Sequence, residues 1–82
     1  MTHAAIHIVD DDDDVREGLA WLFDSRGHAT AVWDSGAPFL EAVRALRGQW
    51  QQAVVLLDVR MAPMSGLQVF EQLKVMACPW PV

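Results

Sequence analysis

The sequence predicts an α/β fold in which a parallel sheet is covered by helices on both faces. Short apolar runs alternate with helical patterns along all 82 residues, in the order strand then helix, three times over. Residues 53–57 (Ala-Val-Val-Leu-Leu) show no polar alternation, as expected for a strand buried on both faces of a parallel sheet. Such alternation is typical of right-handed crossovers, so we expect one small domain without internal repeats or linkers.

The first strand and helix have clear local signals. Residues 4–9 (Ala-Ala-Ile-His-Ile-Val) form a strand-like run that ends in five consecutive aspartates, residues 10–14. The next apolar residues are spaced i, i+4, i+7, i+8, which predicts one face of a helix, with Arg16, Glu17 and Asp24 on the opposite side. That apolar face comprises Val15, Leu19, Leu22 and Phe23. Asp12 or Asp13 is the expected N-cap, and Gly27 supplies a left-handed stop.

The remaining elements follow the same logic. Residues 28–33 predict a weaker second strand, and Ser35 is a plausible N-cap for the helix after it. The expected apolar side of this second helix comprises Phe39, Leu40, Val43 and Leu46, and Gly48 ends it. The third helix is expected to bury Leu67, Phe70, Leu73 and Ala77, and to stop before Pro79. Trp21 does not belong to the apolar face of the first helix. It is expected to be either a partly exposed ring or a contact to something outside this chain.

Composition narrows the function classes. Six basic and eleven acidic residues give a formal charge of −5, which disfavours binding to a nucleic acid backbone. No apolar run approaches the roughly 18 residues of a membrane span. We expect no membrane association, and residues 1–5 show no basic start of a secretory signal. The single cysteine, Cys78, cannot form an internal disulfide and is expected to be a small apolar filler. A cytoplasmic location is therefore expected.

Carboxylates follow the first and third predicted strands, where the acidic run begins and at Asp58. Carboxyl ends of parallel strands share one edge of the sheet, which is where ligands gather in open α/β folds. Converging carboxylates repel one another unless a cation lies between them, and an all-oxygen site suits Mg²⁺. Such an ion also allows a carboxylate to attack a phosphoryl group and form an acyl phosphate. Asp58 is therefore a candidate phosphate acceptor.

Simpler interpretations exist for each feature alone. A run of five aspartates is more often a solvated face or a helix cap than a metal site, and one aspartate after a strand is common in turns. The combination favours a site because both acidic positions end apolar strands. An EF-hand is disfavoured, because Val15 stands where the loop needs glycine and Trp21 where it needs glutamate. The histidines share no metal-ligand spacing with Cys78, and His7 is expected in the core.

Three segments together resemble the receiver domain of bacterial two-component response regulators. They are residues 6–12 (Ile-His-Ile-Val-Asp-Asp-Asp), residues 15–19 (Val-Arg-Glu-Gly-Leu), and residues 56–61 (Leu-Leu-Asp-Val-Arg-Met) with 64–66 (Met-Ser-Gly). Within that family, the sequences of these segments are most similar to FixJ-type transcription regulators. The resemblance implies a flavodoxin-like (CheY-like) three-layer α/β/α fold with strand order 2-1-3. Residues 1–82 would form a partial receiver domain containing the first three βα units, without the fourth and fifth.

The resemblance also assigns roles. Asp58 would take a phosphoryl group from the phosphohistidine of a sensor histidine kinase. Asp11, Asp58 and the backbone carbonyl of Arg60 would hold Mg²⁺, with Asp10 supporting the ion through water. The family's switch Thr/Ser and Lys have no counterpart here, since Lys74, the only lysine, belongs to the third helix. The module would signal to an output domain, by resemblance a transcriptional one, and would not be a turnover enzyme.

Two departures and two rivals accompany this hypothesis. Proline normally follows the methionine at the Met61 position, whereas here Ala62 intervenes before Pro63. With no fourth strand, residues 53–57 would form an open edge, and exposing even two of the four side chains at 54–57 would cost roughly 3–6 kcal/mol. We therefore expect homo-oligomers through this third strand or through exchanged elements. The rivals are a haloacid-dehalogenase-type phosphatase fragment with Asp10 as nucleophile, and a degenerate receiver acting only as a binding surface.

Overall fold

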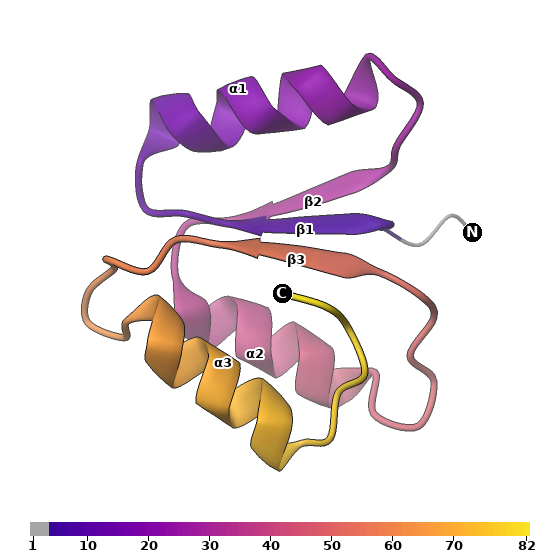
Figure 1. The fold of residues 1–82 in the computed structure, drawn as a ribbon, viewed down its shortest axis with the longest axis vertical. Helices are drawn as coiled ribbons and strands as arrows, with labels where there is room; N and C mark the ends of the chain where they lie inside the picture. The colour runs from indigo at the N-terminus through magenta and orange to yellow at the C-terminus, as the bar shows by residue number, and fades with distance from the viewer. Residues whose placement is uncertain (1–3) are drawn as a thin grey trace.

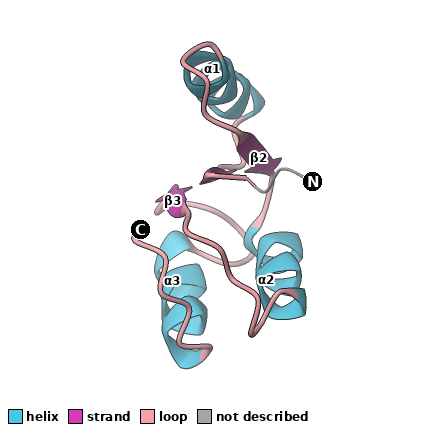
Figure 2. Cartoon of the chain, turned by 90° about the vertical axis from the view of Figure 1, so that its right-hand side faces the viewer, coloured by secondary structure: helices cyan, strands magenta, loops and turns pink. Residues whose placement is uncertain are grey.

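The computed structural model describes residues 4–82 and contains three strands and three helices in strict alternation. In chain order they are β1 (Ile6–Val9), α1 (Asp13–Asp24), β2 (Thr30–Trp33), α2 (Gly36–Ala45), β3 (Val54–Leu57) and α3 (Gly66–Val75). The sheet order is β2-β1-β3, and both strand pairs are parallel. Helix α1 covers one face of the sheet, and α2 and α3 cover the other (Figures 1 and 2). The predicted fold and strand order are confirmed.

The core lies between the sheet and the pair α2 and α3. Its fully buried side chains come from all these elements, and the largest are Val9, Phe39, Val43, Val55 and Val69. The opposite face of the sheet is less completely covered, because its helix, α1, contains no buried residue. On α1, the predicted apolar face is only partly covered, with Val15 45% and Leu22 39% exposed. Trp21 is 71% exposed, as both interpretations of it require.

The buried side of α3 differs from the prediction. Leu67 and Phe70 are 61% and 39% exposed, and Ala77 lies beyond the helix with a left-handed φ of 59°. The predicted burial of Leu73 is confirmed, but the other buried residues of the helix are Gly66 and Val69, and Met76 just after its end is also buried. Apolar residues occur on more than one side of this helix, so two stripes satisfy helical spacing. The structure buries the one that also contacts α2.

Of two smaller predictions about α2, the burial of Leu46 was wrong, whereas the N-cap at Ser35 is confirmed. Leu46 is 44% exposed, because the helix ends at Ala45 and Leu46 belongs to the turn after it. Ser35 is the N-cap by position, yet its side chain accepts no bond from the helix. Its hydroxyl contacts the Asp34 carboxylate instead, at 3.3 Å. Gly27 and Gly48 both have φ of 85°, as expected for residues that follow helix ends.

The carboxyl-terminal segment partly covers the outer edge of β3. The Val55 N–H donates to the Pro81 carbonyl at 2.8 Å, and the Trp80 indole donates to the Gln51 carbonyl at 2.6 Å. Trp80 is buried and stacks on His7 with 4.8 Å between ring centroids. The expected core position of His7 is thus confirmed. The edge is less open than the sequence suggested, although Val54 remains 42% exposed.

Within residues 4–82, no helix combines the length and the hydrophobicity that crossing a bilayer requires. Residues 1–3 lie outside the described part of the chain, and the expectation about a secretory signal falls mainly on them.

Candidate metal and phosphoacceptor site

Three carboxylates meet at the carboxyl ends of β1 and β3. Asp10, Asp11 and Asp58 each offer one oxygen, and these oxygens all lie within 4.8 Å of one another. The juxtaposition follows from strand register, because Val9 pairs with Leu57 and the Asp58 N–H donates to the Val9 carbonyl at 3.0 Å. Asp10 and Asp58 are half-buried, whereas Asp11 is exposed. The structure therefore brings together the three carboxylates that the sequence singled out.

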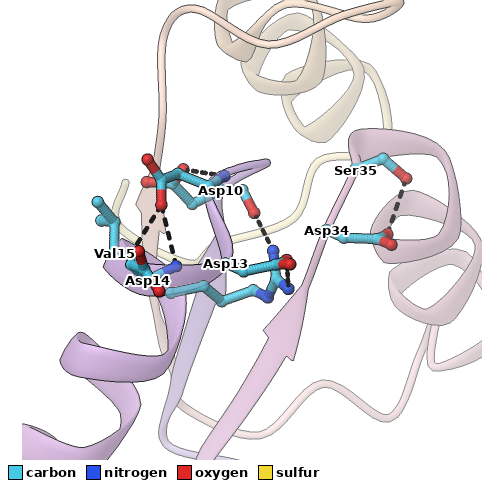
Figure 3. A network of polar contacts seen from close by, with 8 residues as sticks. Asp10, Asp13, Asp14, Val15, Asp34 and Ser35 are labelled. Carbon is cyan, nitrogen blue, oxygen red and sulfur yellow. Dashed lines mark hydrogen bonds and ion pairs between the residues drawn. The ribbon is translucent and has the colours of Figure 1, made fainter.

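The next aspartate of the β1–α1 loop, Asp12, does not belong to this carboxylate cluster. The Asp12 carboxylate caps α1 by accepting the N–H groups of Asp14 and Val15, at 2.9 and 3.2 Å. The Asp12 N–H in turn donates to Asp10 Oδ1 at 2.9 Å. Figure 3 shows these contacts at the start of α1. Asp12 is thus the helix cap that the sequence allowed, and its carboxylate points to the helix.

Asp58 is held by the loop that follows β3. The Arg60 N–H donates to Asp58 Oδ1 at 3.1 Å, and the Gly66 N–H donates to the Val59 carbonyl at 3.1 Å. At the start of α3, Ser65 and Gln68 form a reciprocal capping box, which fixes where this loop ends. The Ala62–Pro63 peptide bond in the same loop is cis. The helix start therefore sits directly behind the candidate phosphoacceptor.

Arg16 is the site neighbour that the sequence analysis missed. We expected it on the outward side of the first helix, but its side chain is only 13% exposed. Its guanidinium donates to the Asp10 carbonyl at 2.8 Å and forms an ion pair with Asp13. The hydrogen bond to Asp13 raises the pKa of Arg16, and Asp34 adds to this through its charge. The signal available in the sequence was the i, i+3 spacing of Asp13 and Arg16 at a helix start.

This donor set suits a hard divalent cation. Three converging carboxylates repel each other, and Mg²⁺ binds through one or two protein carboxylates while it keeps several waters. Two half-buried aspartates and one exposed aspartate leave one side of the cluster open to solvent and to a phosphoryl donor. The residues present therefore fit the expected ion.

Comparison with known proteins now decides the family. The family model for the response regulator receiver domain matches residues 6–82, which is nearly the whole chain. The chain belongs to the response regulator receiver domain family. Domains of this family interact with sensor histidine kinases and generally bind Mg²⁺ at an acidic phosphorylation site.

Curated relatives of this receiver are regulatory transcription factors. It is 42% identical over 72 residues to the C4-dicarboxylate transport transcriptional regulatory protein DctR of Rhodobacter capsulatus, covering 84% of this chain and 33% of that protein. It is 41% identical over 68 residues to the transcriptional regulatory protein FixJ of Azorhizobium caulinodans, covering 83% and 30%. The chain thus spans about a third of the length of these relatives.

Solved structures agree with this placement. The crystal structure of FixJ-N superposes with a TM-score of 0.80 at 31% identity, over 99% of this chain and 62% of that one. The response regulator StyR superposes with a TM-score of 0.79 at 37% identity, over 93% and 36%. The receiver fold, with its FixJ-type character, is therefore confirmed.

Proposed function

We propose that this receiver accepts a phosphoryl group on Asp58 from the phosphohistidine of a sensor histidine kinase. The observation that supports the proposal most is the convergence of Asp10, Asp11 and Asp58 within 4.8 Å at one edge of the sheet. Asp11, Asp58 and the Arg60 backbone carbonyl would hold Mg²⁺, and Asp10 would support it through water. Residues 1–82 would serve as the first three βα units of a cytoplasmic phosphorelay module that controls transcription through an output domain outside them.

The proposed reaction is a direct transfer of the phosphoryl group from histidine to Asp58. One Asp58 carboxylate oxygen attacks phosphorus, an O–P bond forms, and the P–N bond to histidine breaks with its electron pair going to the nitrogen. The ring, which already carries a proton on its other nitrogen, leaves as neutral imidazole. Bound Mg²⁺ would neutralise charge on the phosphoryl oxygens. Because the Arg60 N–H already bonds Oδ1 of Asp58, it restricts rotation of the carboxylate. Phosphorylation is stoichiometric, so the module is a signalling component rather than a turnover enzyme.

Labelling with a small phosphodonor tests this proposal. We expect the chain to form one adduct with acetyl phosphate and Mg²⁺, located at Asp58 by peptide mass spectrometry, and Asp58→Asn to form none. Asp34→Asn is the matched control, because Asp34 follows β2 but does not belong to the three-carboxylate cluster. An adduct at Asp10 would instead indicate the phosphatase chemistry, and no adduct at all a degenerate receiver. The capping role of Asp12 does not favour the phosphatase, which needs that carboxylate at the reacting group.

We also propose that the 82-residue chain self-associates beside β3. A groove of about 260 Å³ runs between β3 and α3, and its wall is apolar. It is lined by Leu57, Val59, Gly66, Leu67, Phe70 and Val82. A second copy would cover these side chains and pair with the remaining strand edge.

Light scattering coupled to size exclusion tests this association at micromolar concentration. We expect a dimer for the chain and a shift toward monomer for Leu67→Glu, which places a charge in the groove. Val75→Glu should leave the dimer intact, because Val75 is also apolar and exposed on α3 but does not line the groove. A folded monomer of the unmodified chain that unfolds cooperatively would contradict the proposal.

A further inference from the structure

Arg16 ties the β1–α1 loop to the helix that follows it. The guanidinium donates to the Asp10 backbone carbonyl at 2.8 Å and pairs with the Asp13 carboxylate, so one planar group bridges the two ends of the loop. Figure 3 shows Asp10 and Asp13 at the two ends of this bridge. Asp10 and Asp11, two of the three clustered carboxylates, belong to this same loop. Its shape therefore decides whether their oxygens reach Asp58.

Charge and geometry make opposite predictions for this arginine. A positive guanidinium next to an acidic cluster should weaken cation binding, so charge alone predicts tighter binding when it is removed. Geometry predicts the reverse, because the ligands lose a support that holds them together. Asp13 pairs with Arg16, and the additional charge of Asp34 lies near it. These carboxylates offset the charge of Arg16, so the geometric effect should dominate.

We propose that Arg16 is a positioning residue for the cation site, which it assembles by bridging the Asp10 carbonyl and Asp13. The proposal rests on the function proposed above, because it concerns the same Mg²⁺ site. Arg16 touches neither the ion nor the phosphoryl group. It acts by fixing the backbone from which Asp10 and Asp11 extend. A lysine would retain the charge but has no planar fork to engage both partners at once.

Titration with magnesium chloride, followed by the amide resonances of Asp11 and Asp58, measures affinity in folded molecules only. We expect Arg16→Met to weaken Mg²⁺ binding about tenfold, the lower end of the range for groups that support metal ligands. Arg16→Lys should also weaken binding, but by less. Arg26→Met is the matched control, since it removes the same charge from an exposed position just past the other end of α1. It should bind Mg²⁺ like the unmodified chain.

Each result decides the question. Arg16→Met binding Mg²⁺ as tightly as, or more tightly than, the unmodified chain would overturn the proposal. If that variant does not fold, Arg16→Lys takes its place, and an affinity equal to that of the unmodified chain would overturn it equally. A variant with lower thermal stability in EDTA but unchanged Mg²⁺ affinity would show that Arg16 is merely structural. Absence of Mg²⁺ binding by the unmodified chain would instead refute the site itself, and this role with it.

Discussion

Replacing Gly66 by alanine should directly disturb the end of β3, where Asp58 lies. A Cβ at this position would lie 2.2 Å from the Asp58 carbonyl oxygen and 2.8 Å from the Val59 Cα. Close carbon-to-oxygen contacts in proteins lie at about 3.3 Å, so the start of α3 and the end of β3 must separate by about 1 Å. The Gly66 N–H bond to the Val59 carbonyl opposes that separation, as does the capping box that fixes the helix start.

The expected cost follows from this crowding. Overpacking typically costs about 1–3 kcal/mol, and the better helix propensity of alanine recovers at most about 1 kcal/mol. We therefore expect Gly66→Ala to lower the free energy of unfolding by about 1–2 kcal/mol, as measured by urea titration. A displacement of about 1 Å at reacting groups can reduce rates about a hundredfold. The rate of Asp58 labelling by acetyl phosphate should accordingly fall at least about tenfold.

Gly18 provides a matched control within the same chain. It lies inside α1, and a Cβ there would meet no atom within 4 Å. Gly18→Ala should therefore raise the free energy of unfolding by about 0.5–1 kcal/mol and leave Asp58 labelling unchanged. If Gly66→Ala behaves like Gly18→Ala in both assays, the close packing of the start of α3 against the end of β3 is refuted.

Three further predictions concern other parts of the fold. Trp80→Ala should cost about 3–5 kcal/mol in urea denaturation, because it removes the buried ring stacked on His7; a loss below about 1 kcal/mol would contradict that packing. Asp12→Ala should lower the free energy of unfolding by about 1 kcal/mol through loss of the α1 cap, and an unchanged melting curve would argue against the cap. Burial raises the pKa of the Cys78 thiol, so iodoacetamide at pH 8 should alkylate it more slowly in folded protein than in urea. Equal rates would contradict that.

Much of the candidate site was predictable because it depends on strand ends and strand order. An apolar run that ends in aspartate locates a carboxylate along the chain, and parallel pairing brings the ends of β1 and β3 to one edge. The family resemblance supplied the strand order, which places the end of β3 next to the end of β1. The local sequence was also enough to predict Asp12 as a helix cap, because an aspartate directly before a helical pattern is a typical N-cap.

Other features depended on packing that spacing alone does not specify. Apolar residues on several sides of α3 allow two buried stripes, and the packing against α2 buries Val69 in place of Leu67 and Phe70. Helical spacing places Arg16 on the outward side of α1, because it treats every polar residue as facing solvent. A long side chain at a helix start can turn back over the preceding loop, which helical spacing does not represent.

The strand order also explains why the three-carboxylate cluster forms at the ends of β1 and β3 and not at the end of β2. The chain leaves β1 into α1 on one face of the sheet and leaves β3 toward α3 on the opposite face (Figure 1). The loops after these neighbouring strands therefore lead to opposite faces, so the ends of β1 and β3 form the topological switch point of this open α/β sheet. Asp34 follows β2 on the far side of β1, so it lies away from the switch point although it also follows a strand. Asp58→Asn would consequently remove a carboxylate from the cluster, whereas Asp34→Asn, which changes the net charge by the same amount, would leave all three carboxylates in place.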